Sequence, residues 1–559
     1  MEPKPKNARG WCGGKKLAVA ASMMATTGVA HAYKFTTPPE WDLNLDTSLQ
    51  YTVGMRAQGR DSNIGNGPFY AEGDYKFDPG ELVTNRVQGL FEFQGSYQKQ
   101  AGFRVSASAW KDFAYSDSVA TNPAFPPSFL TYPSGEYSGD TKRYHIEGAE
   151  LLDAFVFANP RVGSVPLYFK VGRFTQQWGN ALFDSFGSIS YSQHPVDFIK
   201  AFTQPGSEVK ELFLPRTQIM ATAEVNPQFS VSAQYFFEFR GNRYPQGGTY
   251  LGAADFLGTG PQSGGALAGV AGGPVSAGNE IKPRNTNNNF GVKATWSPDW
   301  AGGDLGFYYR QFDEVQPWTL LDLNANGGGF LHESYAQNVK LLGLSFERAF
   351  GNVSTGFETS YRKDTALNSA LTNGIPGVPT TAGARGDVVS AIANAFIQLG
   401  STPLWDAGVL LAEISYTNLL KVTDNASMFN GVGYAACTTN SKWDGCATKH
   451  AVSMSISFEP QWLQAFPNIN LSMPMSLSTG IYGNAAYAAG SAQGSSVYSI
   501  GVKATAPRGS TVTLQYNGYH SRANQKSNLP GVGQFYSSGN GPIALNDKGW
   551  VQLTFKTSF

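Results

Sequence analysis

The sequence is poor in charged residues. Asp, Glu, Lys and Arg make up only 15% of its 559 residues, and 41 acidic side chains balance 41 Lys and Arg. Average soluble proteins contain about 25% charged residues, so this composition is unusual for a soluble globular domain. The zero net charge also leaves no basic surface for nucleic acid, which the sequence therefore excludes as a partner.

Long hydrophobic runs are missing after the first residues of the chain, where no stretch reaches the roughly 18 apolar residues of a transmembrane helix. The chain begins with basic residues, a short apolar run over 17–29 and the cleavage pattern Ala30-His31-Ala32. These are the three parts of a secretory signal peptide. An uncleaved anchor is the alternative, but it would need roughly 20 apolar residues. We therefore predict a signal peptide at 1–32 and a mature domain at 33–559.

Cysteine is rare, with three residues in the whole chain. Cys12 lies in the signal peptide, so the exported domain keeps only the pair Cys437 and Cys446, which are close in sequence. An exported protein folds in an oxidising compartment, where such a pair forms a disulfide. A metal site is the alternative, but only His450 lies nearby as a further ligand. We predict a disulfide, and neither a metal nor another cofactor.

Local catalytic motifs are missing as well. None of the histidines stands in an H-E-x-x-H pattern, and the chain contains no G-x-S-x-G elbow and no phosphate-binding glycine loop. We therefore predict that the protein is not an enzyme. A Ser/His site assembled from distant strands would leave no local signature, so a hydrolase remains an alternative.

Alternation of apolar and polar residues is what the sequence has in abundance. Between Asp42 and Ala57 the odd positions include Leu43 and Val53, while the even positions include Gln50. Such a long two-faced strand is typical of a transmembrane barrel, because strands of soluble proteins usually have about 5 or 6 residues. The pattern recurs in eighteen candidate strands, at 42–57, 82–98, 102–115, 143–158, 166–177, 216–225, 228–240, 288–297, 303–312, 336–349, 352–362, 386–400, 404–420, 448–460, 468–483, 495–506, 510–521 and 547–559.

The gaps between these strands alternate in length. Those after even-numbered strands are short, whereas those after odd-numbered strands are long, such as 178–215, 241–287, 313–335 and 522–546. Bacterial outer-membrane barrels have short periplasmic turns and long outer loops. The spacing therefore predicts an all-β antiparallel transmembrane barrel with both termini in the periplasm and the cysteine pair in or beside an outer loop. Sixteen strands is the alternative to eighteen, because two of the candidate strands are short.

The end of the chain supports this interpretation. In the last strand Val551, Leu553 and Phe555 alternate with polar residues, and the chain ends on Phe559. A final alternating strand that ends in Phe resembles the signal that the outer-membrane assembly machinery recognises, with Phe555 and Phe559 as its residues. We therefore expect the assembly machinery and the lipids of the outer membrane as partners.

The loop at 178–215 differs from the other long loops in its apolar content. A loop that is wholly solvated would not need Phe183, Phe186 and Phe198, so we predict that it folds into the lumen. An outer cap packed on neighbouring loops is the alternative. Strand faces add further inward residues, since Glu238 and Arg240 lie opposite the lipid face of their strand. The candidates for the lumen or its constriction are Arg173, Trp178, Asp197, Glu208, Lys210, Glu211, Glu238 and Arg240.

The same stretch resembles a proteobacterial outer-membrane family known as domain of unknown function 1302. The resemblance rests on Val171-Gly172-Arg173 with Trp178-Gly179, on Pro205-Gly206-Ser207-Glu208 with Lys210-Glu211, and on Gly248-Thr249-Tyr250. Asn180 and His194 depart from the family pattern. The resemblance implies a barrel that works with a lipoprotein-like periplasmic adaptor and an inner-membrane transporter of the efflux superfamily, and it implies hydrophobic cargo.

These observations together predict an outer-membrane channel or conduit for small, hydrophobic molecules. Two alternatives from other functional classes stay open. One is an outer-membrane hydrolase of lipids or esters, and the other is a surface or assembly scaffold whose long loops, above all 241–287, bind another macromolecule.

Overall fold

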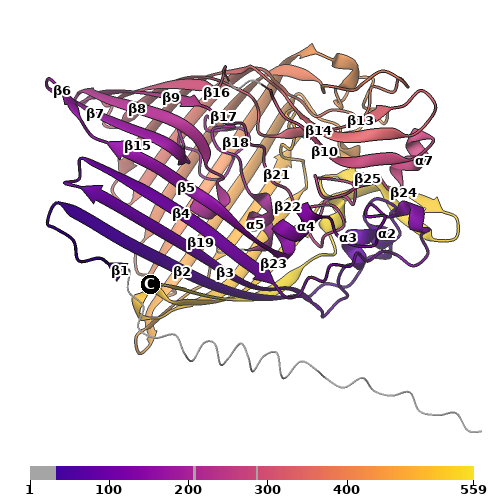
Figure 1. Ribbon diagram of the computed structural model, residues 1–559, viewed down its shortest axis with the longest axis horizontal. Helices are drawn as coiled ribbons and strands as arrows, with labels where there is room; N and C mark the ends of the chain where they lie inside the picture. The colour runs from indigo at the N-terminus through magenta and orange to yellow at the C-terminus, as the bar shows by residue number, and fades with distance from the viewer. Residues whose placement is uncertain (1–32, 205–208, 285–286) are drawn as a thin grey trace, which may run out of the picture.

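The fold is a closed antiparallel β-barrel with a layer of ordered loops at one end (Figure 1). The structure is a computed structural model that describes residues 33–204, 209–284 and 287–559. The predicted signal peptide with its cleavage residues Ala30 and Ala32 lies outside the described residues. Among those that are described, no helix is long and apolar enough to cross a membrane.

Within the described residues the barrel wall has eighteen strand positions, and it closes because the last strand pairs with the first from Ser48–Ser558 to Arg56–Trp550. The prediction of an antiparallel barrel with eighteen strands is thereby confirmed against sixteen. In wall order the strands are β2 (Trp41–Arg56), β3 (Leu82–Tyr97), β4 (Ala101–Asp112), β5 (Glu147–Ala158), β7 (Val165–Phe174), β8 (Arg216–Asn226), β9 (Phe229–Phe236), β11 (Phe290–Trp296), β12 (Asp304–Phe312), β15 (Val339–Phe350), β16 (Val353–Ala366), β17 (Arg385–Leu399), β18 (Ala407–Asp424), β19 (His450–Phe466), β20 (Ile469–Ser472) continued by β21 (Met475–Tyr482), β22 (Ser496–Thr505), β23 (Thr511–His520) and β26 (Trp550–Ser558).

The two faces of the wall follow the alternation in the sequence. On β18, Ile414 is 50% exposed on the outside, whereas its neighbour Ser415 is 4% exposed on the inside. On β2, Met55 faces outward and Arg56 is fully buried within the barrel. Exposed apolar and buried polar residues are the reverse of a soluble protein, and they fit a wall with lipid outside and a polar interior.

One predicted strand is interrupted. The candidate at 468–483 is divided into β20 and β21 by Met473 and Pro474. Proline has no N–H to donate to the neighbouring strand, so the ladder breaks at this position. Both pieces still pair with β19 and β22, and the wall remains closed there.

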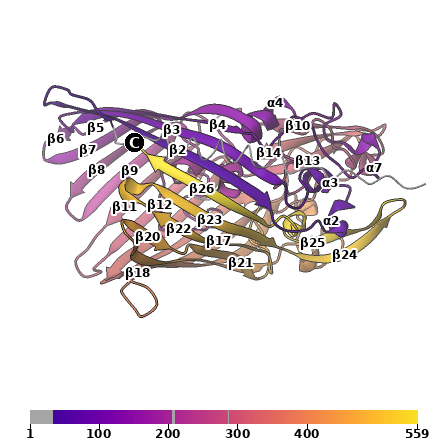
Figure 2. The same cartoon turned by 90° about the horizontal axis from the view of Figure 1, so that it is seen from below.

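The short turns and the carboxyl terminus lie at one end of the barrel, and the long loops lie at the other (Figures 1 and 2). Two-residue strands β1 (Tyr33–Lys34) and β6 (Arg161–Val162) extend the wall at the short-turn end. The backbone of Phe559 exchanges two hydrogen bonds with Thr47, at 2.7 and 3.0 Å, which fixes the last residue against β2.

The long-loop end contains regular structure that the sequence interpretation left as loops. Gap 313–335 forms a hairpin of two strands, which is joined by a third strand from 241–287, and gap 522–546 forms a second hairpin. The hairpin in 313–335 has buried residues on both faces, with Leu320 and Leu321 fully buried, so the alternation that reveals a wall strand is absent. These strands are β10 (Val275–Ile281), β13 (Pro317–Leu323), β14 (Gly329–Tyr335), β24 (Arg522–Leu529) and β25 (Gly533–Asn540).

Short helical turns complete the described structure. Most of them lie in the long-loop layer, and two lie in the segment between β7 and β8. They are α2 (Ser62–Gly65), α3 (Ala71–Tyr75), η1 (Pro127–Phe129), α4 (Gly139–Thr141), η2 (Lys142–Ile146), α5 (Phe198–Thr203), α6 (Val209–Leu212), α7 (Leu267–Ala271), η3 (Ala426–Met428), η4 (Lys442–Asp444), η5 (Pro507–Gly509) and η6 (Ile543–Leu545).

Candidate functional site

The segment between β7 and β8 crosses the inside of the barrel, and we call its described residues, 175–204 and 209–215, the inward segment. Its first part is held by Glu358 on β16, whose carboxylate accepts hydrogen bonds from the backbone N–H groups of Asn180, Ala181 and Ile189 at 2.6, 3.2 and 2.8 Å. A wall carboxylate thus binds N–H groups that would otherwise be unpaired in a turn.

Glu413 on β18 continues this attachment. Its carboxylate accepts hydrogen bonds from the N–H groups of Leu182, Phe183 and Asp184 at 2.6, 3.0 and 2.6 Å. Hydrogen bonds to an ionised acceptor are stronger than neutral ones. Glu358 and Glu413 together therefore fix the path of the inward segment against the inner face of the wall.

Two buried arginines on β12 and β16 make further contacts with the inward segment. Arg310 on β12 donates to the carbonyl groups of Ile189 and Tyr191, each at 2.7 Å. The fully buried guanidinium of Arg362 on β16 lies between two rings, 4.4 Å from the centre of Tyr191 and 4.8 Å from that of Tyr487. Cations are attracted to aromatic faces at these distances, so Arg362 joins the inward segment to the loop after β21.

The second part of the inward segment binds the opposite wall. Lys200 of α5 forms a 2.9 Å ion pair with Glu150 on β5, and Glu150 also pairs with Arg240 and Arg243 at 3.3 and 2.8 Å. All four side chains are largely buried. Attachment to both walls shows that the segment folds into the lumen, as the sequence predicted, and does not form an outer cap.

The inward segment leaves a cavity of about 350 Å³ beside the wall of β18, β19, β21 and β22. Phe183, Phe186 and Phe198 line the cavity from the inward segment. Phe186 and Phe198 are stacked with a 5.8 Å centroid distance and an angle of 4°, and Phe198 stacks in turn on Tyr244 at 4.8 Å and 14°. One side of the cavity is therefore aromatic, and Tyr244 supports it from behind the lining.

The wall side of the cavity carries hydroxyl groups. Ser415, Ser453, Ser455 and Ser478 line it from three neighbouring strands. Ser415 pairs with Ser453 across β18 and β19, and Ser455 pairs with Ser478 across β19 and β21 with their hydroxyl oxygens 2.9 Å apart. A ring with polar substituents would find an apolar face and hydrogen-bonding groups on opposite sides of this cavity.

Several residues that the sequence singled out lie in this arrangement. Trp178 is buried and packs against Tyr308 of β12, while Asp197 caps α5 through the N–H of Lys200 and pairs with Arg243 at 3.1 Å. Glu211 accepts a hydrogen bond from the side chain of Gln88 on β3 at 2.6 Å, and Arg240 binds Glu150. These four residues position the inward segment and do not line the cavity.

Other candidates lie elsewhere. Arg173 shares the face of Phe169 and Val171, which is the outer face of β7, so it does not reach the lumen by strand alternation. Glu238 accepts hydrogen bonds from the N–H and hydroxyl of Thr217, the residue that pairs with Arg173. Glu208 lies outside the described residues, and so does the side chain of Lys210.

The sequence interpretation missed the residues that organise the site. Glu150, Glu413 and the cavity serines were not singled out, although alternation opposite Ile414 places Glu413 on the inner face. Alternation indicates which residues point inward. It does not indicate which of them meet a loop that crosses the barrel, because that depends on the path of the loop.

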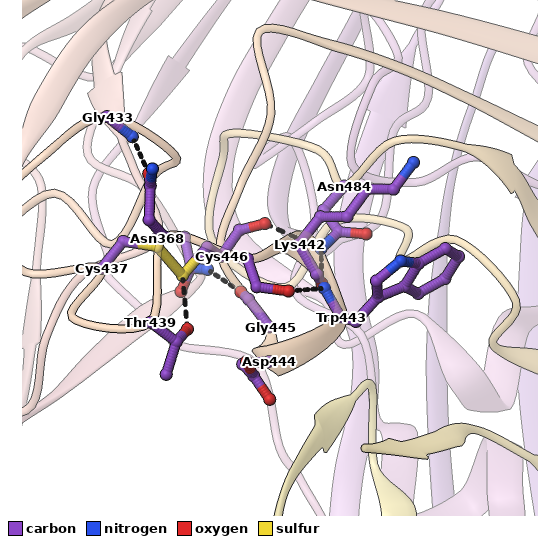
Figure 3. The surroundings of a disulfide bond; sticks show 12 residues. Asn368, Gly433, Cys437, Thr439, Lys442, Trp443, Asp444, Gly445, Cys446 and Asn484 are labelled. Carbon is purple, nitrogen blue, oxygen red and sulfur yellow. Dashed lines mark hydrogen bonds between the residues drawn. A yellow bond between two sulfur atoms is a disulfide. The ribbon is translucent and has the colours of Figure 1, made fainter. Parts of the chain in front are cut away.

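The two cysteines lie in the loop between β18 and β19. Cys437 and Cys446 form a disulfide, and both are buried (Figure 3). The side-chain amide of Asn484 donates to the carbonyl groups of Lys442 and Cys446, each at 2.8 Å, which ties the disulfide loop to the loop after β21. In the described part of the chain no three residues of the types that bind metals come together.

Two histidines of the described structure form hydrogen bonds through their ring nitrogens. His145 accepts a hydrogen bond from the backbone N–H of Gln246 at 3.2 Å, and His450 lies 2.8 Å from the hydroxyl of Tyr416. Neither contact pairs a histidine with a serine nucleophile.

The long-loop layer contains a buried acidic pair above the β2–β5 side of the barrel. Glu72 of α3 accepts hydrogen bonds from the N–H and hydroxyl of Thr131, and the Asp255 carboxylate accepts from the N–H groups of Glu72 and Gly73. Burial, with a further contribution from the charge of Asp255, raises the pKa of Glu72 to about 8. The contacts of Glu72 in the long-loop layer therefore involve a carboxyl group whose pKa is about 8.

A family model with the description "Protein of unknown function (DUF1302)" matches residues 14–559, and no curated protein matches the sequence. Similar solved structures include Pseudomonas aeruginosa OpdK with vanillate, at 10% identity, a TM-score of 0.41, and coverage of 92% of this chain and 98% of that chain. Acinetobacter baumannii OccAB2 has 10% identity, a TM-score of 0.43, and coverage of 93% and 98%. The outer membrane channel DcaP of Acinetobacter baumannii has 10% identity, a TM-score of 0.35, and coverage of 94% and 99%.

Proposed function

The chain belongs to the DUF1302 family, whose description gives no function, and we propose that it is an outer-membrane channel for small, mainly apolar molecules. The observation that carries this proposal is the inward segment, which is attached to both walls yet leaves a cavity of about 350 Å³ with an aromatic side. A segment that only filled the barrel would not need to leave space of the size that small-molecule sites have.

The orientation that we propose places the short turns and both ends of the mature chain in the periplasm. It is supported by the separation of short turns and long loops at opposite ends of the barrel (Figure 1). In this orientation the disulfide loop and the hairpin of β24 and β25 lie outside the cell, and the cavity opens beneath the outer loops.

The proposal is tested by conductance of the purified barrel in planar bilayers. We expect small single-channel currents from the intact chain and currents several-fold larger from a variant that lacks residues 184–213, because that deletion removes the aromatic side of the cavity. A variant that lacks 524–538 of the outer hairpin is the matched control, and its conductance should equal that of the intact chain. The absence of current from both the intact chain and the 184–213 deletion would overturn the proposal.

We also propose that the channel works with a periplasmic adaptor and an inner-membrane transporter of the efflux superfamily, as the family resemblance implies. Trp300 and Leu404, which are 75% and 71% exposed on short turns, offer apolar contacts at that end. Purification from native membranes in mild detergent should recover such partners. If the intact barrel is recovered alone, this would argue for an autonomous channel.

A further inference from the structure

The cavity has an uneven distribution of charge. Of the residues that line it, Asp184 and Glu413 are the only ones of the types Asp, Glu, Lys, Arg and His, and both are acidic. The guanidinium of Arg362 lies near the rings of Tyr191 and Tyr487 and its nitrogens are buried, so it offers no hydrogen bond to a solute in the cavity. The described lining therefore contains two acidic side chains and no basic one.

The two carboxylates differ in how they are used. Both oxygens of Glu413 accept hydrogen bonds from the inward segment. Asp184 uses Oδ1 to accept from the N–H groups of Phe186 and Gly187 at 2.9 and 2.7 Å, whereas its Oδ2 is buried with no hydrogen-bond partner in the described structure. A buried carboxylate oxygen without a donor makes an approaching anion costly and a hydroxyl donor favourable.

The remaining lining is neutral and two-sided. Phe186 and Phe198 present two stacked aromatic rings, and Ser455 with Ser478 presents hydroxyl groups from the wall opposite. Aromatic rings bind a further ring either stacked or edge to face, and serine hydroxyls both donate and accept hydrogen bonds. The lining therefore matches a flat ring that carries hydroxyl groups and no negative charge.

We propose that this cavity is a selectivity site for uncharged ring compounds with hydroxyl substituents, and that Asp184 and Glu413 make it reject anions of the same shape. This inference rests on the proposed function as a channel and names the substrate class of that channel. The stacked rings contact the ring of the solute, the serines exchange hydrogen bonds with its hydroxyl groups, and the carboxylates exclude acids.

The test uses two probes with the same ring and different charge, 4-hydroxybenzyl alcohol and 4-hydroxybenzoate. Block of the single-channel current measures their binding in the passage, and calorimetry on the detergent-solubilised barrel measures it without current. We expect the neutral alcohol to block and bind at a concentration about tenfold lower than the anion. Equal or tighter binding of 4-hydroxybenzoate would overturn the inference, whereas loss of all current would instead contradict the channel function.

Two variants separate charge from shape. Asp184→Asn removes a charge and keeps an oxygen that can accept from Phe186 and Gly187, so the preference for the alcohol should fall severalfold. Phe198→Leu removes the stacked surface and should weaken binding of both probes alike. Glu459→Gln is the control, because Glu459 pairs with Lys503 on the inner face and does not line the cavity. An unchanged preference in Asp184→Asn would also overturn the inference.

Discussion

The inner face of the barrel differs between its two sides. Toward β5, the inward segment is held by buried charges, with Glu150 in contact with Lys200, Arg240 and Arg243. Toward β19 and β21, the wall presents serine hydroxyls such as that of Ser455 to an open cavity. We call these the charged side and the hydroxyl side.

The difference shows how one wall both fixes a segment and leaves a passage. Buried charges are costly unless each has its partner, so a charged network tolerates few changes of position and holds the segment in one place. Hydroxyl groups exchange partners with water or a solute at little cost, because each can donate and accept. The charged side thus supplies position, and the hydroxyl side supplies a surface for a moving solute.

The largest effect should come from breaking the charged side. Glu150→Gln leaves Lys200, Arg240 and Arg243 buried with reduced compensation, so the free energy of unfolding should fall by about 3–5 kcal/mol. Urea unfolding in phospholipid vesicles, followed by tryptophan fluorescence, measures this loss. The inward segment should also become mobile, and the single-channel current should fluctuate between levels.

A control lies on the same strand. Glu147 forms a 2.6 Å ion pair with Lys111, but the two side chains are 60% and 53% exposed. Exposed pairs contribute about 0–1 kcal/mol, so Glu147→Gln should leave both stability and current close to those of the intact chain. Similar losses in the two variants would show that burial of the charges does not distinguish the charged side.

An intermediate effect should appear when the pH is changed. Because burial raises the pKa of Glu72 from 4.5 to about 8, the folded state holds a proton that the unfolded state releases. The protonated Glu72 therefore contributes stability to the long-loop layer above the charged side. This contribution is fully present below the unfolded pKa and is lost as the pH rises toward 8. Trypsin should cleave the 58–81 loop faster at about pH 9 than at about pH 5.5.

The variant Glu72→Gln removes this titration. It should resist trypsin better than the intact chain at high pH and equally well at low pH, so the comparison at each pH cancels the pH dependence of the protease. Cleavage after the exposed Lys99, in the turn between β3 and β4 at the other end of the barrel, is the internal control, and there the two proteins should behave alike. If the cleavage rates of the two proteins differ by the same factor at both pH values, the assignment to Glu72 is contradicted.

Most of the wall could be predicted from the sequence, because each strand meets the same two surroundings along its length. Alternation placed all eighteen wall strands, although strand ends differ by several residues at 143–146, 237–240 and 461–466, and it did not reveal that Pro474 interrupts the strand at 468–483. The outer hairpin of β13 and β14 was missed because Leu320 and Leu321 are both buried, so its faces do not alternate.

The site was less predictable than the wall. Phe183, Phe186 and Phe198 marked the inward segment correctly, since a solvated loop gains nothing from them. The attachments at Glu150 and Glu413 depend on which wall residues the segment meets as it crosses the barrel, and this is a tertiary property with no local pattern. Arg173 illustrates the limit, because a motif drew attention to it while strand alternation places it on the outer face.

The smallest effect should come from the hydroxyl side. The pair Ser455→Ala with Ser478→Ala removes both partners of one hydrogen bond, so no buried group is left unpaired and stability should change by less than about 0.5 kcal/mol. On the inner face of β3 the contrast is Thr84→Val, because the buried hydroxyl of Thr84 donates to Asp112 at 2.6 Å. Its loss leaves a buried carboxylate short of a donor and should cost about 1–3 kcal/mol. Urea unfolding measures the loss of stability in both variants. If removing two hydroxyls beside the cavity lowers the free energy of unfolding as much as removing one beside Asp112, the serines are part of the structural framework and are not a surface kept free for solutes.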